Sequence, residues 1–277
     1  MGILSFFLII ATVLFSWQGF RNKAFYEKYI FSVEKVLVEK QYYRLLSSAL
    51  LHTGWMHLLF NMFSLYAFSE AVELYLGPLQ YLLIYFSGAV AGNLLSLLIH
   101  KHHYYRSAGA SGAVCAVIFA AIAIFPGMSI GIFPFPFSIP AWVYGLLFVG
   151  ISIFALRARF DDIGHDAHLG GALAGMLLAI AMQPSSLQNN LLPILVVTIP
   201  CLILIYLLAK KPHLFLGSRN VFDTPKEKLT IDQRYNATKA EMQKEVDRIL
   251  DKISRRGYSS LTANEKSRLE AYSKEVK

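Results

Sequence analysis

Apolar and polar residues divide the chain into long hydrophobic segments with short polar connections, followed by a polar C-terminal part. A helix needs about 20 apolar residues to cross a hydrocarbon core of roughly 30 Å, and several segments reach that length. Because lipid cannot pair with the backbone, each crossing segment must be helical. The pattern predicts seven membrane-spanning helices, at about residues 2–19, 54–76, 79–99, 109–126, 140–156, 165–182 and 190–209.

Two connecting segments and the first apolar segment carry further information. Residues 20–53 mix aromatic with charged side chains, which is typical of a segment lying in the membrane interface. Residues 127–140 are uncharged and punctuated by Pro and Gly, which indicates a connector at the interface. The first apolar segment lacks a basic start and a clear cleavage site, so we interpret it as a retained membrane helix rather than a signal peptide.

The C-terminal part, residues 210–277, is polar and holds most of the lysines and arginines. Residues 238–255 carry apolar side chains at helical spacing, and Gly257 ends this predicted helix. Thr262-Ala-Asn-Glu265 is a capping box that opens a second helix. The pattern predicts a polar linker followed by a small helical hairpin, with no catalytic motif in either.

Composition agrees with a membrane protein. The chain is 55% hydrophobic and only 16% charged, which excludes an ordinary soluble globular protein. Its net charge of +8 is accounted for by membrane-flanking residues and the tail, and no basic–aromatic motif predicts a nucleic-acid partner. Cys115 and Cys201 both lie in apolar segments, where single cysteines are usually small packing residues, so no disulfide is predicted.

Polar residues inside membrane segments are costly, and three clusters of them are candidates for function. The first is His57 and Asn61, whose spacing places imidazole and amide on one helix face. Such a pair can serve simply as interhelical hydrogen-bonding groups, and the pair alone does not decide between that role and catalysis.

The second and third clusters combine one reactive side chain with small neighbours. Ser111 lies within Gly109-Ala-Ser-Gly112, and Gly112 begins a ridge of small residues that lets another helix come close. His168 shares one helical stripe with Gly171 and Gly175.

Two helices packed through these small faces would bring the serine and the imidazole within hydrogen-bond reach, as base-activated nucleophilic attack requires. His57 and Asn61 could then donate to the developing oxyanion. Each cluster has a simpler explanation in helix packing, but together they supply a nucleophile, a base and oxyanion donors.

In this combination the chain resembles the rhomboid intramembrane serine proteases over roughly residues 1–182. Gly109-Ala-Ser111-Gly matches the family's G-x-S-G, and Ala167-His168 with Gly171 and Gly175 matches its A-H-x-x-G-x-x-x-G. His57 and Asn61 match its H-x-x-x-N, Tyr43-Arg44 falls at its aromatic–Arg element, and Glu73 lies near the end of its second helix.

The resemblance implies an all-α polytopic membrane bundle of the rhomboid type, with about seven transmembrane helices. It implies a catalytic core of six transmembrane helices over residues 1–182 and an additional seventh transmembrane helix over 183–209. The polar linker and helical hairpin over 210–277 are predicted from composition and spacing alone. The implied activity is that of an intramembrane serine endopeptidase that cleaves transmembrane protein substrates near the membrane surface.

The resemblance also assigns residue roles. Ser111 would be the nucleophile and His168 its base, with His57, Asn61 and the Ser111 backbone N–H forming the oxyanion hole. No cofactor, metal or third acid is expected, and Asp166 is interpreted as a loop charge. Structural roles are expected for the remaining motif residues, Gly109, Gly112, Gly171, Gly175, Arg44 and Glu73.

The sequence departs from the family at Cys115, where many members have a tyrosine that packs on the catalytic imidazole, and at Tyr43, where the family has tryptophan. One alternative is therefore a non-proteolytic rhomboid-like protein that binds transmembrane helices. A second is a metal-dependent enzyme or transporter that uses the histidines, although no H-E-x-x-H motif is present.

Localisation is predicted as a multi-pass protein of a bacterial cell membrane, with lipid and transmembrane substrates as partners. The resemblance places the active site on the extracytoplasmic side, whereas the lysines and arginines of the same loops place it inside. We give the resemblance the preference. The pattern indicates neither the physiological substrate nor the oligomeric state.

Overall fold

The computed structural model describes residues 2–102, 104–131, 137–158 and 164–210, with the side chains of 155–158 left out. In the C-terminal part it describes only residues 249, 252–253, 261–262 and 265. The chain divides into two compact units, Met1–Asp223 and Thr224–Lys277.

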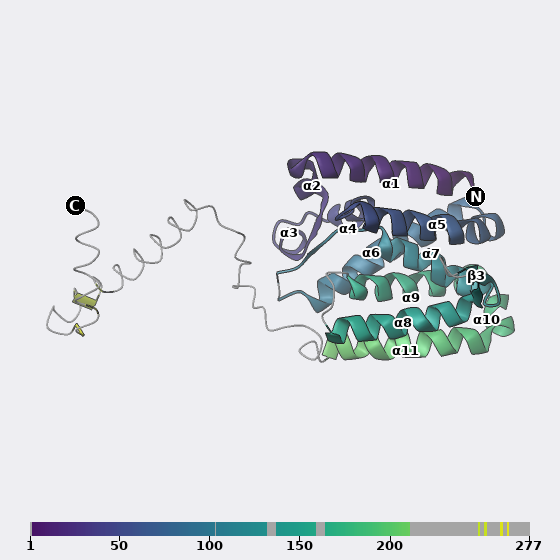
Figure 1. Cartoon of the computed structure of the whole chain (residues 1–277). Coiled ribbons are helices and arrows are strands. Elements are labelled where there is room, and N and C mark those ends of the chain that lie inside the picture. Colours follow the sequence, from purple (N-terminus) through teal and green to yellow (C-terminus); the bar gives the residue numbers. More distant parts are fainter. Residues whose placement is uncertain are drawn as a thin grey trace. The chain divides into compact units, whose positions relative to one another are not determined.

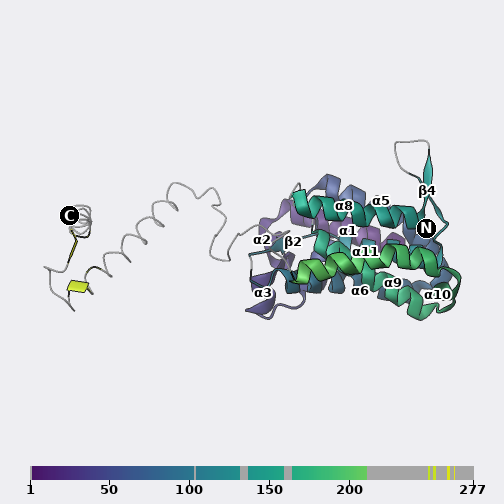
Figure 2. The same cartoon turned by 90° about the horizontal axis from the view of Figure 1, so that it is seen from below.

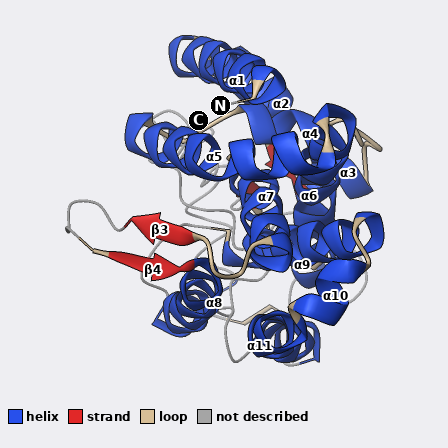
Figure 3. Ribbon diagram, turned by 90° about the vertical axis from the view of Figure 1, so that its right-hand side faces the viewer, coloured by secondary structure: helices blue, strands red, loops and turns tan. Residues whose placement is uncertain are grey.

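A helix stands at each of the seven segments predicted from the apolar pattern, and the first unit is a bundle of these helices (Figure 1). They are α1 (Ile3–Arg21), α5 (Trp55–Leu76), α6 (Pro78–Ile99), α7 (Ser111–Ile124), α8 (Ala141–Ala158), α9 (His165–Met182) and α11 (Leu191–Lys210). The short helix α10 (Ser185–Asn189) joins the last two. Seen along the helices, α7 lies in the middle, with α1 and α5 on one side and α8 and α11 on the other (Figure 3).

Three helices in the described part of the chain, α1, α6 and α11, are long and apolar enough to cross a membrane by length and composition. Helices α5 and α9 carry ionisable side chains among their apolar ones. Helix α7 has only 14 residues, a length of about 21 Å, and every residue after Ser111 is buried by its neighbours. A helix enclosed by protein need not match the bilayer thickness, so α7 can begin below the ends of the helices around it.

Close backbone contacts hold α7 against α9. A Cβ added at Gly171 would lie 2.0 Å from the Gly112 carbonyl oxygen, and one at Gly175 would lie 2.0 Å from the Ala116 carbonyl oxygen. Since no side chain fits into such a gap, the two helices meet backbone to backbone along the small-residue stripes seen in the sequence.

Helix α6 joins the same contact through glycines that the sequence analysis did not single out. A Cβ at Gly88 would lie 2.2 Å from the Ala116 Cβ, and one at Gly92 would lie 2.5 Å from the Ala167 carbonyl oxygen. The signal was present in the sequence, because Gly88 and Gly92 form a G-x-x-x-G pair in an apolar segment. Helices α6, α7 and α9 therefore form the closely packed centre of the bundle.

The long connection between α1 and α5 is folded into short elements. They are α2 (Lys23–Tyr29), β1 (Phe31–Ser32), α3 (Val33–Leu37), α4 (Arg44–Ser47) and the 3₁₀ helix η1 (Ser48–Leu50). Arg44 is only 4% exposed and donates to the backbone oxygens of Glu27 and Ile30. Its planar guanidinium thus binds two turns of the connection at once.

A buried carboxylate ties the first helix to the bundle. Glu73, near the end of α5, is 6% exposed and accepts hydrogen bonds from the Leu4 and Ser5 backbone N–H groups, each at 3.0 Å, and from the Ser5 hydroxyl. Because α1 has no side-chain cap of its own, Glu73 satisfies its free N–H groups and complements the positive end of the helix dipole.

The connector predicted over residues 127–140 contains a two-stranded antiparallel ribbon. Strand β3 (Ser129–Gly131) pairs with β4 (Ser138–Pro140), with Ile130 opposite Ile139. The ribbon follows the C-terminal end of α7 and projects away from the helices (Figure 2).

In the C-terminal unit the described residues show the predicted capping box. The Glu265 N–H donates to the Thr262 hydroxyl at 3.3 Å, and the Thr262 N–H donates to the Glu265 carboxylate at 2.7 Å. Lys252 also pairs with Glu265 at 2.8 Å. The remainder of the predicted hairpin lies outside the described residues.

Candidate active site

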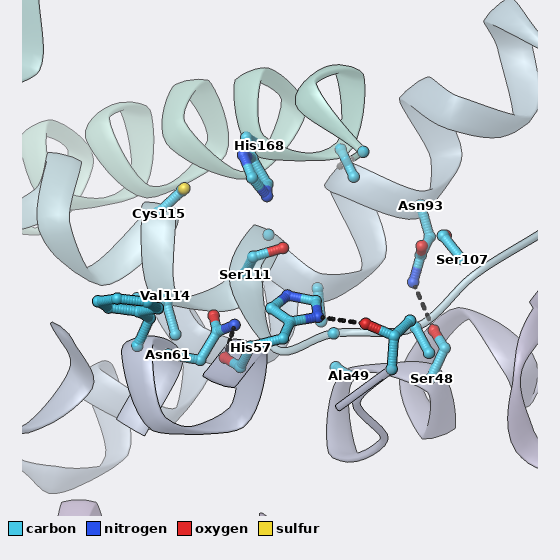
Figure 4. A pocket seen from close by; sticks show the side chains of 18 of the residues that line it. Ser48, Ala49, His57, Asn61, Asn93, Ser107, Ser111, Val114, Cys115 and His168 are labelled. Carbon is cyan, nitrogen blue, oxygen red and sulfur yellow. Dashed lines mark hydrogen bonds between the residues drawn. The ribbon is translucent and has the colours of Figure 1, made fainter. Parts of the chain in front are cut away.

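A cavity of about 740 Å³ lies between α5, α7, α8 and α9 and the loop that precedes α7. Its lining includes Ser111, His168, His57 and Asn61. Four residues chosen from the sequence, on three different helices, therefore face one space (Figure 4).

Ser111 is the first residue of α7, and the loop before it is held at several points. Strand β2 (Arg106–Ser107) pairs antiparallel with β1. The Gly109 N–H donates to the Ser48 carbonyl oxygen at 3.1 Å. Because Ser111 is the first residue of α7, it sits at the positive end of the helix dipole, and its backbone N–H is among the groups that lack an intrahelical acceptor.

His168 stands in the first turns of α9 and points toward Ser111 (Figure 4). It is 8% exposed, and the close backbone contact between α7 and α9 places its helix directly against the helix that begins with Ser111. Its imidazole lies against the ring of His165, with centroids 5.6 Å apart, and against the ring of Phe148 on α8, with centroids 5.8 Å apart.

His57 and Asn61 lie on one face of α5, opposite His168 across the cavity (Figure 4). The Thr53 hydroxyl lies 3.1 Å from His57 Nδ1, and a hydroxyl that donates there fixes the ring proton on Nε2. A Cβ at Gly109 would lie 3.0 Å from that Nε2, so the glycine lets the imidazole reach the serine loop. The Asn61 amide donates one N–H to the His57 carbonyl oxygen at 2.9 Å, leaving its second N–H for the cavity.

His52 is a site residue that the sequence analysis did not assign. It is fully buried, and its Nε2 accepts from the Ala110 backbone N–H at 3.3 Å. Its Nδ1 lies 2.8 Å from the Ser16 hydroxyl, which in turn donates to the Leu50 carbonyl oxygen at 2.8 Å. This arrangement requires neutral imidazole with the proton on Nδ1, and it links α1 to the residue before Ser111. The sequence held only a weak signal for this role, namely that His52 lies five residues before His57.

Burial, reinforced by the neighbouring His57, lowers the pKa of His52 from 6.5 to about 3. A histidine whose folded-state pKa is depressed makes the fold less stable as the pH falls below its unfolded-state value. We expect the wild-type protein to lose up to about 2 kcal/mol of unfolding free energy from this group between pH 7.5 and pH 5. Thermal unfolding at several pH values measures the loss.

The matched variant for this prediction is His52→Gln, whose amide can still accept from Ala110 and donate to Ser16 but does not titrate. Its stability should fall less steeply with acidification than that of the wild type. His102→Gln changes an exposed loop histidine and should keep the wild-type slope. Equal slopes for all three proteins would contradict the assigned role of His52.

The interpretation of Asp166 as a loop charge is wrong. Helix α9 begins at His165, so Asp166 lies in its first turn, and it is only 3% exposed. Its carboxylate pairs with His100 Nε2 at 3.2 Å and accepts from the Tyr105 hydroxyl at 3.4 Å. The charge is buried because these partners, from the end of α6 and the following loop, close over it. Asp166 joins three elements beside the site.

Among the described residues, no group of three His, Cys, Asp or Glu side chains is arranged to hold a metal ion. His52 and His57 face each other edge to face, with centroids 5.1 Å apart, but His52 is engaged with Ser16 and Ala110. His165 and His168 likewise lie edge to face. These four histidines thus form two ring pairs.

Comparison with known proteins gives the family. A family model described as a rhomboid domain matches residues 39–185, over half of the chain. A second model, of a family of unknown function (DUF6576), matches residues 229–275.

Similar proteins carry rhomboid names. Rhomboid protein 1, mitochondrial, of Saccharomyces cerevisiae is 31% identical over 165 residues, covering 58% of this chain and 47% of that one. The putative rhomboid protease YdcA of Bacillus subtilis is 29% identical over 143 residues, covering 50% and 66%. The rhomboid protease GluP of Bacillus subtilis is 28% identical over 149 residues, covering 53% and 27%. The chain spans about half the length of the first of these relatives. With its helical bundle and apolar spans, the chain belongs to the rhomboid family of helical membrane proteins.

Proposed function

We propose that the protein is an intramembrane serine endopeptidase that cleaves transmembrane protein substrates near the membrane surface. The observation that carries the proposal is the convergence of Ser111, His168, His57 and Asn61 on one cavity from α7, α9 and α5 (Figure 4). The protease names of two relatives support it.

The proposed reaction proceeds through an acyl-enzyme. His168 takes the proton of the Ser111 hydroxyl as the oxygen attacks the substrate carbonyl carbon. The resulting oxyanion accepts hydrogen bonds from the Ser111 backbone N–H, from the Asn61 amide and from His57 Nε2–H. The C–N bond then breaks, and the leaving amine takes the proton from His168. Water, deprotonated by the same imidazole, releases the acyl group.

The mechanism uses a dyad rather than a triad. Asp166 is the carboxylate nearest to His168 in sequence, but it is paired with His100 and Tyr105. It therefore holds the start of α9 rather than acting on the base. Orientation of His168 must come from other contacts.

Three parts are proposed for the whole chain: a catalytic core of six transmembrane helices over residues 1–182, an additional transmembrane helix over 183–209, and a polar linker with a C-terminal helical hairpin over 210–277. A bacterial cell membrane is the proposed location. That the protein lies in a membrane follows from the family and the apolar helices. Which membrane it occupies is the proposed part, since two similar proteins, from yeast and Arabidopsis thaliana, have mitochondrial names.

Covalent labelling with a fluorophosphonate tests the proposed function. We expect the purified protein to be labelled at Ser111, and labelling to fall by about 10²-fold or more when His168 is replaced with Ala, because the hydroxyl then has no base. Mass spectrometry of the labelled peptide identifies the residue. Absence of labelling with a folded protein would favour the alternative, a rhomboid-like protein that binds transmembrane helices without cutting them. Cleavage that requires a metal and leaves Ser111 unlabelled would favour the metal enzyme.

A further inference from the structure

The imidazole of His168 lies against an aromatic ring that belongs to a different helix. The rings of Phe148, on α8, and His168, on α9, have centroids 5.8 Å apart and planes inclined at 35°. Phe148 is itself braced by Phe119 on α7, edge to face at 5.7 Å. The Phe148 ring, which packs against α7, thus also lies against the imidazole that has to reach a serine on α7.

An imidazole at this position needs such a contact. Rotation about the bond to the ring is broad, so packing must select the orientation that aims one nitrogen at the Ser111 hydroxyl. Cys115, one turn after Ser111, also lines the cavity, but its thiol has no ring face to place against the imidazole. His165 contacts the imidazole edge to face. Phe148 is the ring that lies most nearly parallel to it among these contacts.

We propose that Phe148 is a positioning residue for His168, and that it keeps the base aligned with Ser111. The inference rests on the proposed function and adds to it, because it makes the reactivity of the dyad depend on α8. Among the described residues, Gly145 of α8 packs closely on Ile122 of α7 and Val197 of α11, where an added Cβ would lie 2.8 Å and 3.2 Å from side-chain atoms. These contacts hold the turn of α8 that precedes Phe148 against α7 and α11.

Two other roles for Phe148 make different predictions. If the ring only fills space beside Phe119, an aliphatic side chain of similar size will serve as well, and only stability will respond. If the ring is a wall that contacts the substrate, its loss will change KM and the preference for substrate residues but not the reactivity of Ser111 toward a small reagent.

The test compares Phe148→Leu, Phe148→Tyr and the matched control Phe154→Leu, which changes a ring of the same helix that is 69% exposed. We expect Phe148→Leu to slow fluorophosphonate labelling of Ser111 by about 10-fold to 100-fold, because a small misplacement of a catalytic group has effects of that size. The kcat for a model transmembrane substrate should fall by a similar factor with little change in KM. Phe148→Tyr, which keeps the ring, should retain most of the labelling rate.

The inference would be overturned if Ser111 in a folded Phe148→Leu variant were labelled at the wild-type rate, whether or not KM changes. Equal slowing by Phe154→Leu would also overturn it, because that ring is exposed and is not among the residues that line the cavity. Thermal unfolding of each variant shows whether a slow labelling rate reflects loss of the fold. If Phe148→Leu does not fold, Phe148→Tyr still tests the inference, because this variant keeps the ring and must label Ser111 at close to the wild-type rate. Failure of the wild-type protein itself to label or cleave would instead refute the proposed function.

Discussion

Cleavage of a model transmembrane substrate should fall by about 10³-fold or more when Ser111 is replaced with Ala, with no loss of the folded bundle. The hydroxyl oxygen is the only heavy atom removed, and in the proposed mechanism it is the atom that attacks the carbonyl carbon. Ala is compatible with the first turn of α7 and fits the small-residue environment, so α7 and α9 keep their contact. Gel separation of the fragments formed in detergent or in vesicles measures the rate.

The control for this experiment is Ser129→Ala, which changes an exposed serine in β3, beyond the far end of α7. It should cleave at the wild-type rate. Thermal unfolding should give the same midpoint for both variants and the wild type. Cleavage by a folded Ser111→Ala protein at a rate near that of the wild type would remove Ser111 from the mechanism, because no second hydroxyl can replace an atom that forms the acyl bond.

The largest effect on stability is expected from Gly175→Ala. A single Cβ at this position would lie 2.0 Å from the Ala116 carbonyl oxygen and 2.4 Å from its Cα. Both are backbone atoms, which cannot move aside as the end of a long side chain does. The two helices would have to separate, and we expect the free energy of unfolding to fall by about 3 kcal/mol. Because Gly175 lies two turns after His168, the same displacement should also slow labelling of Ser111.

Gly150→Ala is the matched control, since it makes the same substitution in another helix where an added Cβ meets nothing within 4 Å. It should be neutral or stabilising by up to about 1 kcal/mol, because alanine loses less backbone entropy on folding. Thermal unfolding of both variants in the same detergent gives the difference. Equal stability of the two variants would show that α7 and α9 do not meet as closely as described.

Much of the site was accessible from the sequence because its signals are local or periodic. Apolar length predicted a helix at each of seven segments, since a backbone in lipid has no other way to pair its polar groups. The stripe of Gly171 and Gly175 and the ridge beginning at Gly112 predicted a close helix pair, because small residues at helical spacing have no other common use in a membrane. Three motifs then indicated the chemistry, namely the pair His57 and Asn61, then Ser111, and then His168.

Other features depended on which elements the connections bring together, and no local pattern encodes that choice. Three contacts join residues that are far apart in the sequence. They are the pairing of Asp166 with His100, the hydrogen bond from the Ala110 N–H to His52, and the packing of the Phe148 ring against His168. Hydrophobic periodicity reports that a side chain is buried, but not what it is buried against.

By itself, the sequence determined the helical segments and the residue types available for catalysis, because segment length and spacing follow from the geometry of one helix in lipid. Only the tertiary structure decided that α7 is short and enclosed, so that Ser111 lines a cavity. It also decided that an aromatic ring from α8, that of Phe148, lies beside His168. Those outcomes depend on the packing of several helices at once, and packing is a property of the assembled bundle.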